Sequence, residues 1–134
     1  MATKKLSTVF IVEDNAVQRS MLTDHLAKYP SLQVKEFSSG DACLKELISG
    51  NVAEPQLVLM DYFLDTSFGA SKDGLETLAK LKEIYPETDV IMLTSVENEK
   101  IVDLAKKKGA LDYVVKSVGS FEKLDSIIKG HFTM

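Results

Sequence analysis

Two hydrophobic periods alternate along this chain of 134 residues, and this alternation constrains the fold more than any other feature of the sequence. Five short apolar runs have the length of a strand: Thr8–Val12, Leu32–Phe37, Leu57–Met60, Val90–Leu93 and Leu111–Val115. Runs with little polar interruption are typical of strands that are buried on both faces of a parallel sheet. The second run contains Gln33 and Lys35, and we therefore expect it to form a half-exposed edge strand.

Each apolar run is followed by a stretch in which apolar residues recur at helical spacing. The five stripes are Val17, Met21, Leu22, Leu26 and Tyr29; Cys43, Leu44, Leu47 and Ile48; Leu75, Leu78, Leu81, Ile84 and Tyr85; Ile101, Val102, Leu104 and Ala105; and Phe121, Leu124, Ile127 and Ile128. Helix-ending residues follow them, namely Pro30, Gly50, Pro86, Gly109 and Gly130. Asn15 with Gln18, and Asp73 with Glu76, have the spacing of capping boxes and predict two helix starts.

Five strands alternating with five helices predict an α/β fold. Right-handed crossovers place helices on both faces, so we expect a five-stranded, doubly wound parallel sheet with strand order 2-1-3-4-5. The length fits one domain spanning residues 1–134. Because few residues follow the fifth helix, we expect no DNA-binding unit in this chain, which is either a stand-alone domain or a fragment. The segment from Tyr62 to Lys72 has no clear period and is expected to be a long loop.

Composition excludes several classes of protein. The chain has 16 Lys and Arg residues against 20 Asp and Glu, and the resulting net charge of −4 argues against direct nucleic-acid binding. Its single cysteine, Cys43, cannot form an internal disulfide and lies on an apolar stripe, so we expect it in the core together with Met21, Met60 and Met92. No apolar run approaches the ~20 residues of a membrane span, and no secretory signal is recognisable. A cytoplasmic protein without membrane contact is expected.

Residues with distinct chemistry follow four of the predicted strands. Glu13 and Asp14 follow the first strand, Asp61 the third, Thr94 the fourth and Lys116 the fifth. The carboxyl ends of parallel strands lie at one edge of the sheet, which is where open α/β sheets bind ligands. Three carboxylates placed there would repel one another, and Mg²⁺ is a cation that prefers such oxygen ligands. A hydroxyl and a lysine beside a metal-binding acidic cluster favour a site for a phosphoryl group.

Taken singly, these residues have ordinary explanations. An acidic pair suits a helix N-terminus, an aspartate suits a turn, and a lysine suits the surface. The combination at four strand ends is what favours a functional site. His25 and His131 have no ligand partner at metal spacing, so structural or solvated roles are expected for both.

Several motifs resemble the receiver domain of two-component response regulators, the CheY-like family, over residues 7–131. They are Phe10-Ile-Val-Glu-Asp14 with Arg19, the strand Leu-Val-Leu-Met-Asp61, Asp73-Gly74, Ile91-Met-Leu-Thr94-Ser95, Gly109-Ala110 and Tyr113-Val-Val-Lys116. The resemblance implies that Asp61 accepts a phosphoryl group from a phosphohistidine of a sensor histidine kinase or a histidine phosphotransfer protein. It further implies Mg²⁺ held by Asp14 and Asp61, by Glu13 through water, and by the backbone carbonyl of Phe63.

The resemblance also implies a switch. Lys116 would pair with the phosphoryl oxygens, Thr94 would hydrogen-bond the phosphoryl group, and Tyr113 would change rotamer with Thr94. This would alter the face formed by the fourth helix, the fifth strand and the fifth helix, where a downstream effector or a second copy of the chain would bind. Such a protein is a phosphoacceptor regulator with self-catalysed phosphotransfer and dephosphorylation, and not an enzyme in the usual sense.

The chain departs from the family pattern beside the predicted site. Gly74 follows Asp61 by thirteen positions, where the family usually has eight, so the loop that includes Asp65 to Lys72 is extended. Alignment with the family motifs implies that Phe63 and Val96 occupy the two positions best placed to orient a hydrolytic water, and apolar side chains cannot do so. We therefore expect slow self-dephosphorylation.

Three other functions remain open at this stage. A phosphorylation-independent scaffold of receiver shape would have no need of the acid, hydroxyl and lysine set. A Mg²⁺-dependent phosphatase with an aspartate nucleophile would want a second acid where Phe63 stands. A flavin-binding protein of the same topology would place phosphate after the first strand, where Glu13 and Asp14 would repel it.

Overall fold

The computed structural model describes residues 4–62 and 74–134, and its centre is a sheet of five parallel strands. The strands are β2 (Thr8–Val12), β3 (Gln33–Phe37), β4 (Leu57–Met60), β5 (Asp89–Thr94) and β6 (Asp112–Val115). They lie in the order β3-β2-β4-β5-β6. This is the order 2-1-3-4-5 of the five predicted strands, so the predicted topology is confirmed.

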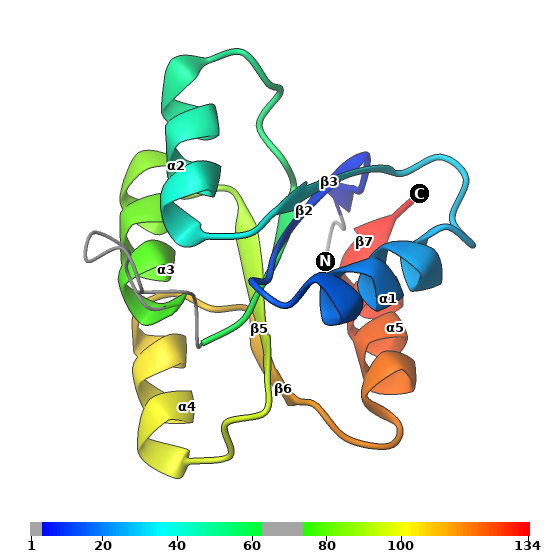
Figure 1. Ribbon diagram of the computed structural model, residues 1–134, viewed down its shortest axis with the longest axis vertical. Coiled ribbons are helices and arrows are strands. Elements are labelled where there is room, and N and C mark those ends of the chain that lie inside the picture. The colour runs from blue at the N-terminus through cyan, green and yellow to red at the C-terminus, as the bar shows by residue number, and fades with distance from the viewer. Residues whose placement is uncertain (1–3, 63–73) are drawn as a thin grey trace.

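Five helices connect these strands and cover both faces of the sheet. They are α1 (Ala16–Leu26), α2 (Gly40–Ser49), α3 (Gly74–Ile84), α4 (Glu99–Lys107) and α5 (Ser120–His131). Figure 1 shows α1 and α5 on one side of the sheet and α2, α3 and α4 on the other. The doubly wound α/β architecture expected from the alternating periods is thus confirmed.

Alternate strand residues supply two hydrophobic cores, one on each face of the sheet. On the face covered by α2, α3 and α4, the strand residues Phe10, Met60 and Met92 are buried together with Cys43. On the face covered by α1 and α5, Ile11, Leu59, Ile91 and Val114 pack against helix residues such as Leu22 and Leu124. Burial raises the pKa of the Cys43 thiol to about 12, so this cysteine belongs to the core as predicted.

A polar cluster joins the two helices on one of these faces. Asp125 of α5 accepts a hydrogen bond from the Tyr29 hydroxyl at 3.0 Å, and its carboxylate also contacts Lys28 and the Nε2 atom of His25, at 2.9 Å. The His25 ring stacks on Phe121 with 4.5 Å between centroids. His25 therefore has the structural role that was expected for it.

The strand register brings the functional ends of the strands level. Val12 pairs with Met60 and Met60 with Met92, while Thr94 pairs with Val115. The residues that follow these positions, Glu13, Asp61 and Lys116, therefore leave the sheet at the same edge.

Several local details differ from the sequence-based expectations. Two short strands, β1 (Lys4–Lys5) and β7 (Phe132–Thr133), form a separate parallel pair. No hydrophobic period in the sequence predicts this pair. Phe132 is buried, and α5 continues through Gly130 to reach it, so the predicted helix end at Gly130 is wrong. Helix α1 ends at Leu26, before Tyr29. Met21 is 52% exposed because Leu22 and Leu26 carry the buried face of α1, and its predicted core position is also wrong.

The helix starts follow cap chemistry. The Asn15 side chain accepts from the Gln18 backbone N–H at 2.9 Å, as the capping box predicts. Ser39 and Asn98 cap α2 and α4 in the same way, although the sequence analysis did not name them. Asp73, the other predicted cap, lies outside the described residues. Within the described part of the chain, no helix has both the length and the apolar character required to cross a bilayer.

Candidate functional site

Three carboxylates converge at the carboxyl edge of the sheet. Glu13 and Asp14 lie in the turn between β2 and α1, and Asp61 follows β4 directly. One oxygen atom from each of these side chains lies within 4.8 Å of the other two. Glu13 and Asp61 are buried, at 2% and 8% exposure, whereas Asp14 is exposed. The structure therefore brings together the three acids that the strand ends indicated.

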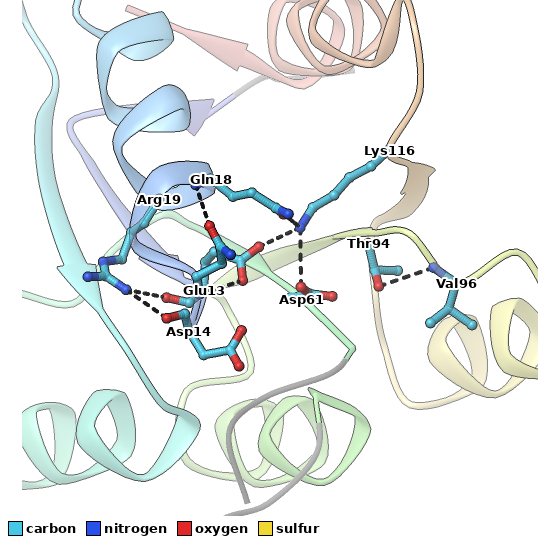
Figure 2. Close-up of polar contacts among 9 residues, drawn as sticks. Glu13, Asp14, Gln18, Arg19, Asp61, Thr94, Val96 and Lys116 are labelled. Atoms are coloured by element: carbon cyan, nitrogen blue, oxygen red, sulfur yellow. Dashed lines mark hydrogen bonds and ion pairs between the residues drawn. The ribbon is translucent and has the colours of Figure 1, made fainter.

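The turn that carries Glu13 and Asp14 is held by its own neighbours. The Asn15 backbone N–H donates to Oε2 of Glu13 at 3.1 Å, and Nη1 of Arg19 donates to the Glu13 carbonyl oxygen at 2.7 Å. The Nε atom of Arg19 also lies 3.4 Å from Oε1 of Glu36 on β3. These contacts fix the backbone of the acidic pair, and Figure 2 shows Arg19 reaching it from α1.

Lys116, which directly follows β6, contacts the acidic cluster. Its Nζ atom lies 3.2 Å from Oδ2 of Asp61 and contacts the carboxylate of Glu13 and the side-chain carbonyl of Gln18 (Figure 2). A lysine ammonium has three N–H donors, and each finds an acceptor here. Among the described residues, the single cation of Lys116 thus faces a cluster of three carboxylates.

The electrostatics of this cluster favour additional positive charge. Burial raises the pKa of Glu13 to about 7, against the lowering effect of hydrogen bonds from Lys116 and Asn15. The negative charge of Asp61 and a side-chain hydrogen bond with Asp14 raise this pKa further. A carboxyl group with such a pKa is only partly ionised near neutral pH. The donor set consists of oxygen atoms, as Mg²⁺ prefers, so these residues fit a bound divalent cation.

Thr94 and Tyr113 lie on the next two strands and share a partner. Thr94 is fully buried at the end of β5, and its Oγ1 atom accepts from the Val96 backbone N–H at 3.4 Å. The Tyr113 side chain is 5% exposed, and its hydroxyl donates to the Val96 carbonyl oxygen at 2.7 Å. In Figure 2, Asp61 lies between the acidic pair and Thr94. Tyr113 therefore points inward and is linked to Thr94 through the backbone of Val96.

Gly74 packs against the backbone of Asp61. A Cβ atom at Gly74 would lie 2.2 Å from the carbonyl oxygen of Asp61 and 2.8 Å from Cα of Tyr62. The Gly74 N–H also donates to the Tyr62 carbonyl at 2.7 Å. The first residue of α3 thus packs directly on the backbone that carries Asp61, and only glycine permits this approach. Phe63 and the loop from Asp65 to Lys72 lie outside the described residues.

Two contributions were missed by the sequence analysis. Gly74 was part of a motif but had no role assigned, and Gln18 appeared only as a capping residue. Gln18 and Lys116 are 98 positions apart, and no local pattern connects an amide in the first turn of a helix with a lysine after a distant strand.

The chain belongs to the response regulator receiver domain family, whose sequence model matches residues 9–129. A protein-glutamate methylesterase/protein-glutamine glutaminase from Carboxydothermus hydrogenoformans is 35% identical over 124 residues, which cover 90% of this chain and 34% of that protein. The chain spans between one third and about one half of the length of the curated relatives that it matches first.

Solved structures show the same fold. The phosphorylated cyanobacterial phytochrome response regulator RcpA superposes with a TM-score of 0.81 at 24% identity, covering 94% of both chains. The Mn²⁺-bound form of the response regulator Rcp1 gives a TM-score of 0.74 at 25% identity, covering 92% of both chains. The protein is thus a receiver domain of the two-component response regulator type. Receiver domains bind Mg²⁺ at an acidic pocket and interact with histidine kinases or phosphotransfer proteins and with effectors, and the acidic cluster described here is consistent with this.

Proposed function

We propose that this chain is a phosphorylation-controlled switch in which Asp61 is the phosphoacceptor. The donor is a phosphohistidine on a sensor histidine kinase or a histidine phosphotransfer protein. The observation that carries the proposal is the contact of Lys116 with both Asp61 and Glu13 at the sheet edge where Asp14 also lies. A structural aspartate needs neither a buried acidic neighbour nor a lysine aimed at its carboxylate.

The transfer itself is a displacement at phosphorus. An oxygen of the Asp61 carboxylate forms a bond to phosphorus, and the bond between phosphorus and the histidine nitrogen breaks. The imidazole keeps the electron pair and takes a proton from water. Lys116 is placed to contact the phosphoryl oxygens, since its Nζ already lies 3.2 Å from the attacking carboxylate.

Asp14 and Asp61 would hold Mg²⁺ directly, with Glu13 acting through water and the backbone carbonyl of Phe63 as a further ligand. When bound, the cation supplies positive charge that lessens repulsion between the carboxylates and the incoming phosphoryl oxygens. The Mn²⁺-bound response regulator Rcp1 supports the binding of a divalent cation by a protein of this fold.

The readout proposed for this switch is the face formed by α4, β6 and α5. Thr94 would leave its contact with Val96 to hydrogen-bond the phosphoryl group, and Tyr113 would follow because it bonds the same residue. A downstream effector, or a second copy of the chain, would bind the altered face. Leu104 of α4, 46% exposed, offers apolar surface there.

Incubation with acetyl phosphate and MgCl₂, followed by intact-mass measurement, tests the proposal. We expect a mass gain of one phosphoryl group in the wild type and none in Asp61→Asn, whose melting temperature should stay the same or rise because a carboxylate is removed from the cluster. A wild type without mass gain, or a variant that still gains it, would contradict the assignment of Asp61. A phosphatase with an aspartate nucleophile is not supported, because Phe63 stands where its second acid belongs.

A further inference from the structure

Gln18 gives Lys116 a neutral partner beside its two charged ones. The side-chain carbonyl of Gln18 accepts from Nζ of Lys116, while the other acceptors of that ammonium are Glu13 and Asp61. Gln18 extends from the first turn of α1 toward the lysine (Figure 2). It therefore completes the hydrogen bonding of the only lysine that contacts the acidic cluster in the described part of the chain.

Packing restrains only part of the Lys116 side chain, which is 21% exposed. Lys116 borders a cavity of about 330 Å³ between α1 and α5, lined mainly by Met21, Leu22, Leu93 and Phe121. A lysine stem has four flexible carbons, and beside open space it can take several rotamers. The position of Nζ consequently depends on the hydrogen bonds at its end.

Gln18 is itself well placed to provide such a restraint. Its backbone N–H is bound by the Asn15 side chain at 2.9 Å, and its neighbour Arg19 donates to the Glu13 carbonyl at 2.7 Å. The same helical turn thus carries Gln18 and fixes the backbone of the acidic pair. The backbone of Gln18 therefore keeps a fixed position relative to Glu13, and the exposed amide extends from this point.

We propose that Gln18 is a positioning residue for Lys116 during phosphoryl transfer, an inference that rests on the function proposed above. When a phosphoryl group approaches Asp61, Lys116 must direct donors from carboxylates to phosphoryl oxygens. A charged carboxylate holds the ammonium strongly and therefore competes with the phosphoryl oxygens for its donors. A neutral amide binds the ammonium more weakly, so it keeps Nζ near the site and competes less with the phosphoryl oxygens. Gln18 thereby limits the conformations that Lys116 must search before transfer.

Variants of Gln18 separate this role from a purely structural one. Gln18→Met keeps the side-chain length but removes the strong acceptor, and Gln18→Glu keeps an oxygen acceptor but adds a competing charge. Met21→Ala is the matched control, since Met21 is exposed on the same helix and lines the same cavity without a hydrogen bond to Lys116. The assay is the rate of phosphorylation by acetyl phosphate at saturating Mg²⁺, with maximal rate and half-saturating donor concentration determined separately.

We expect Gln18→Met to lower the maximal rate roughly three- to tenfold. The Mg²⁺ concentration dependence should not change, and Met21→Ala should behave like the wild type. Gln18→Glu should also be slow, and its rate should recover partly at high salt, which screens the added charge. A wild-type maximal rate in Gln18→Met, or an equal loss in Met21→Ala, would overturn the proposal.

A spectroscopic measurement without phosphodonor tests the contact independently. In a ¹⁵N–¹H spectrum of lysine side chains, the Lys116 ammonium should give a resolved signal in the wild type and in Gln18→Glu. This signal should broaden or move toward those of solvated lysines in Gln18→Met, and an unchanged signal would show that Gln18 does not hold Lys116. A wild type that takes up no phosphoryl group overturns the proposed function instead, so the two failures are distinguishable.

Discussion

Gly74, the first residue of α3, packs against the backbone carbonyl of Asp61 so closely that a methyl group at Gly74 would lie 2.2 Å from that oxygen. The N-terminus of α3 is therefore in direct backbone contact with the residue that follows β4. The position of the Asp61 side chain depends on this contact, because the backbone of Asp61 cannot move toward α3.

Substitution Gly74→Ala tests this dependence. We expect a loss of about 1–3 kcal/mol in the free energy of unfolding, because backbone atoms must shift to accept the Cβ atom, and slower phosphorylation of Asp61. Urea unfolding and the acetyl phosphate assay measure the two effects. The control is Gly130→Ala in α5, where a Cβ meets nothing within 4 Å. This control should be neutral or stabilising by up to ~1 kcal/mol, and an equal loss in both variants would show that the Asp61 contact is unimportant.

Mg²⁺ should raise the melting temperature, and the effect should grow with pH. The pKa of Glu13 is raised from 4.5 to about 7 in the folded protein. Between these values the folded state keeps a proton that the unfolded state releases, so the free energy of unfolding falls as the pH rises. Above pH 7 the ionised cluster has its full repulsion, which Mg²⁺ relieves by binding the folded state.

Thermal melts with and without Mg²⁺ at pH 6 and pH 8 measure this difference. Asp14→Ala should lose most of the response at both values. An equal Mg²⁺ shift in wild type and variant would place the metal elsewhere, and a response that shrinks with rising pH would contradict the electrostatic reasoning.

The sequence predicts the main sheet well because four of its five strands contain several apolar residues in succession, while β3 alternates, as a half-exposed edge strand does. The same property predicts the site, since residues that follow parallel strands must meet at one edge. Structural features that depend on a single contact cannot be predicted from hydrophobic periods. The β1–β7 pair has two residues per strand, Met21 lies on the exposed flank of its helix, and the packing of Gly74 on Asp61 depends on how closely α3 approaches β4.

Asp125 should make a measurable contribution to stability. Partial burial raises the pKa of Asp125, but hydrogen bonds from Lys28, His25 and Tyr29 outweigh this effect and leave the pKa below its ordinary value of 3.8. The contribution is therefore present above about pH 4 and is lost as the pH falls through the folded-state pKa. We expect Asp125→Asn to lose about 1 kcal/mol at pH 7, since partly exposed ion pairs are screened.

Chemical unfolding at several pH values checks this expectation. The exposed residue Glu122 lies on the same helix, and Glu122→Gln removes the same charge as a control. It should change the free energy of unfolding by less than ~0.5 kcal/mol. If Asp125→Asn is no less stable than this control at pH 7, the cluster does not stabilise the helix pair.

The phosphorylated state should decay slowly. A hydrolytic water must be aligned for attack at phosphorus. The family alignment implies that Phe63 and Val96 stand at the two positions best placed to orient this water, and both are apolar. The decay of phosphorylated protein after removal of the donor should be faster when Phe63→Asn and Val96→Glu are combined. A wild-type half-life of seconds, or no acceleration in the double variant, would show that other residues set the rate.

The Asp125 cluster has a further consequence for the proposed switch. Asp125 of α5 contacts His25 of α1, and Lys28 and Tyr29 of the turn that follows α1. One side of α5 is therefore anchored to a part of the chain that lies outside the output face. Phosphorylation would then move α4 and the Tyr113 side chain against a stationary α5. A partner that distinguishes the two states would do so by the surface that α4 and Tyr113 present beside α5, and not by a displacement of α5 itself.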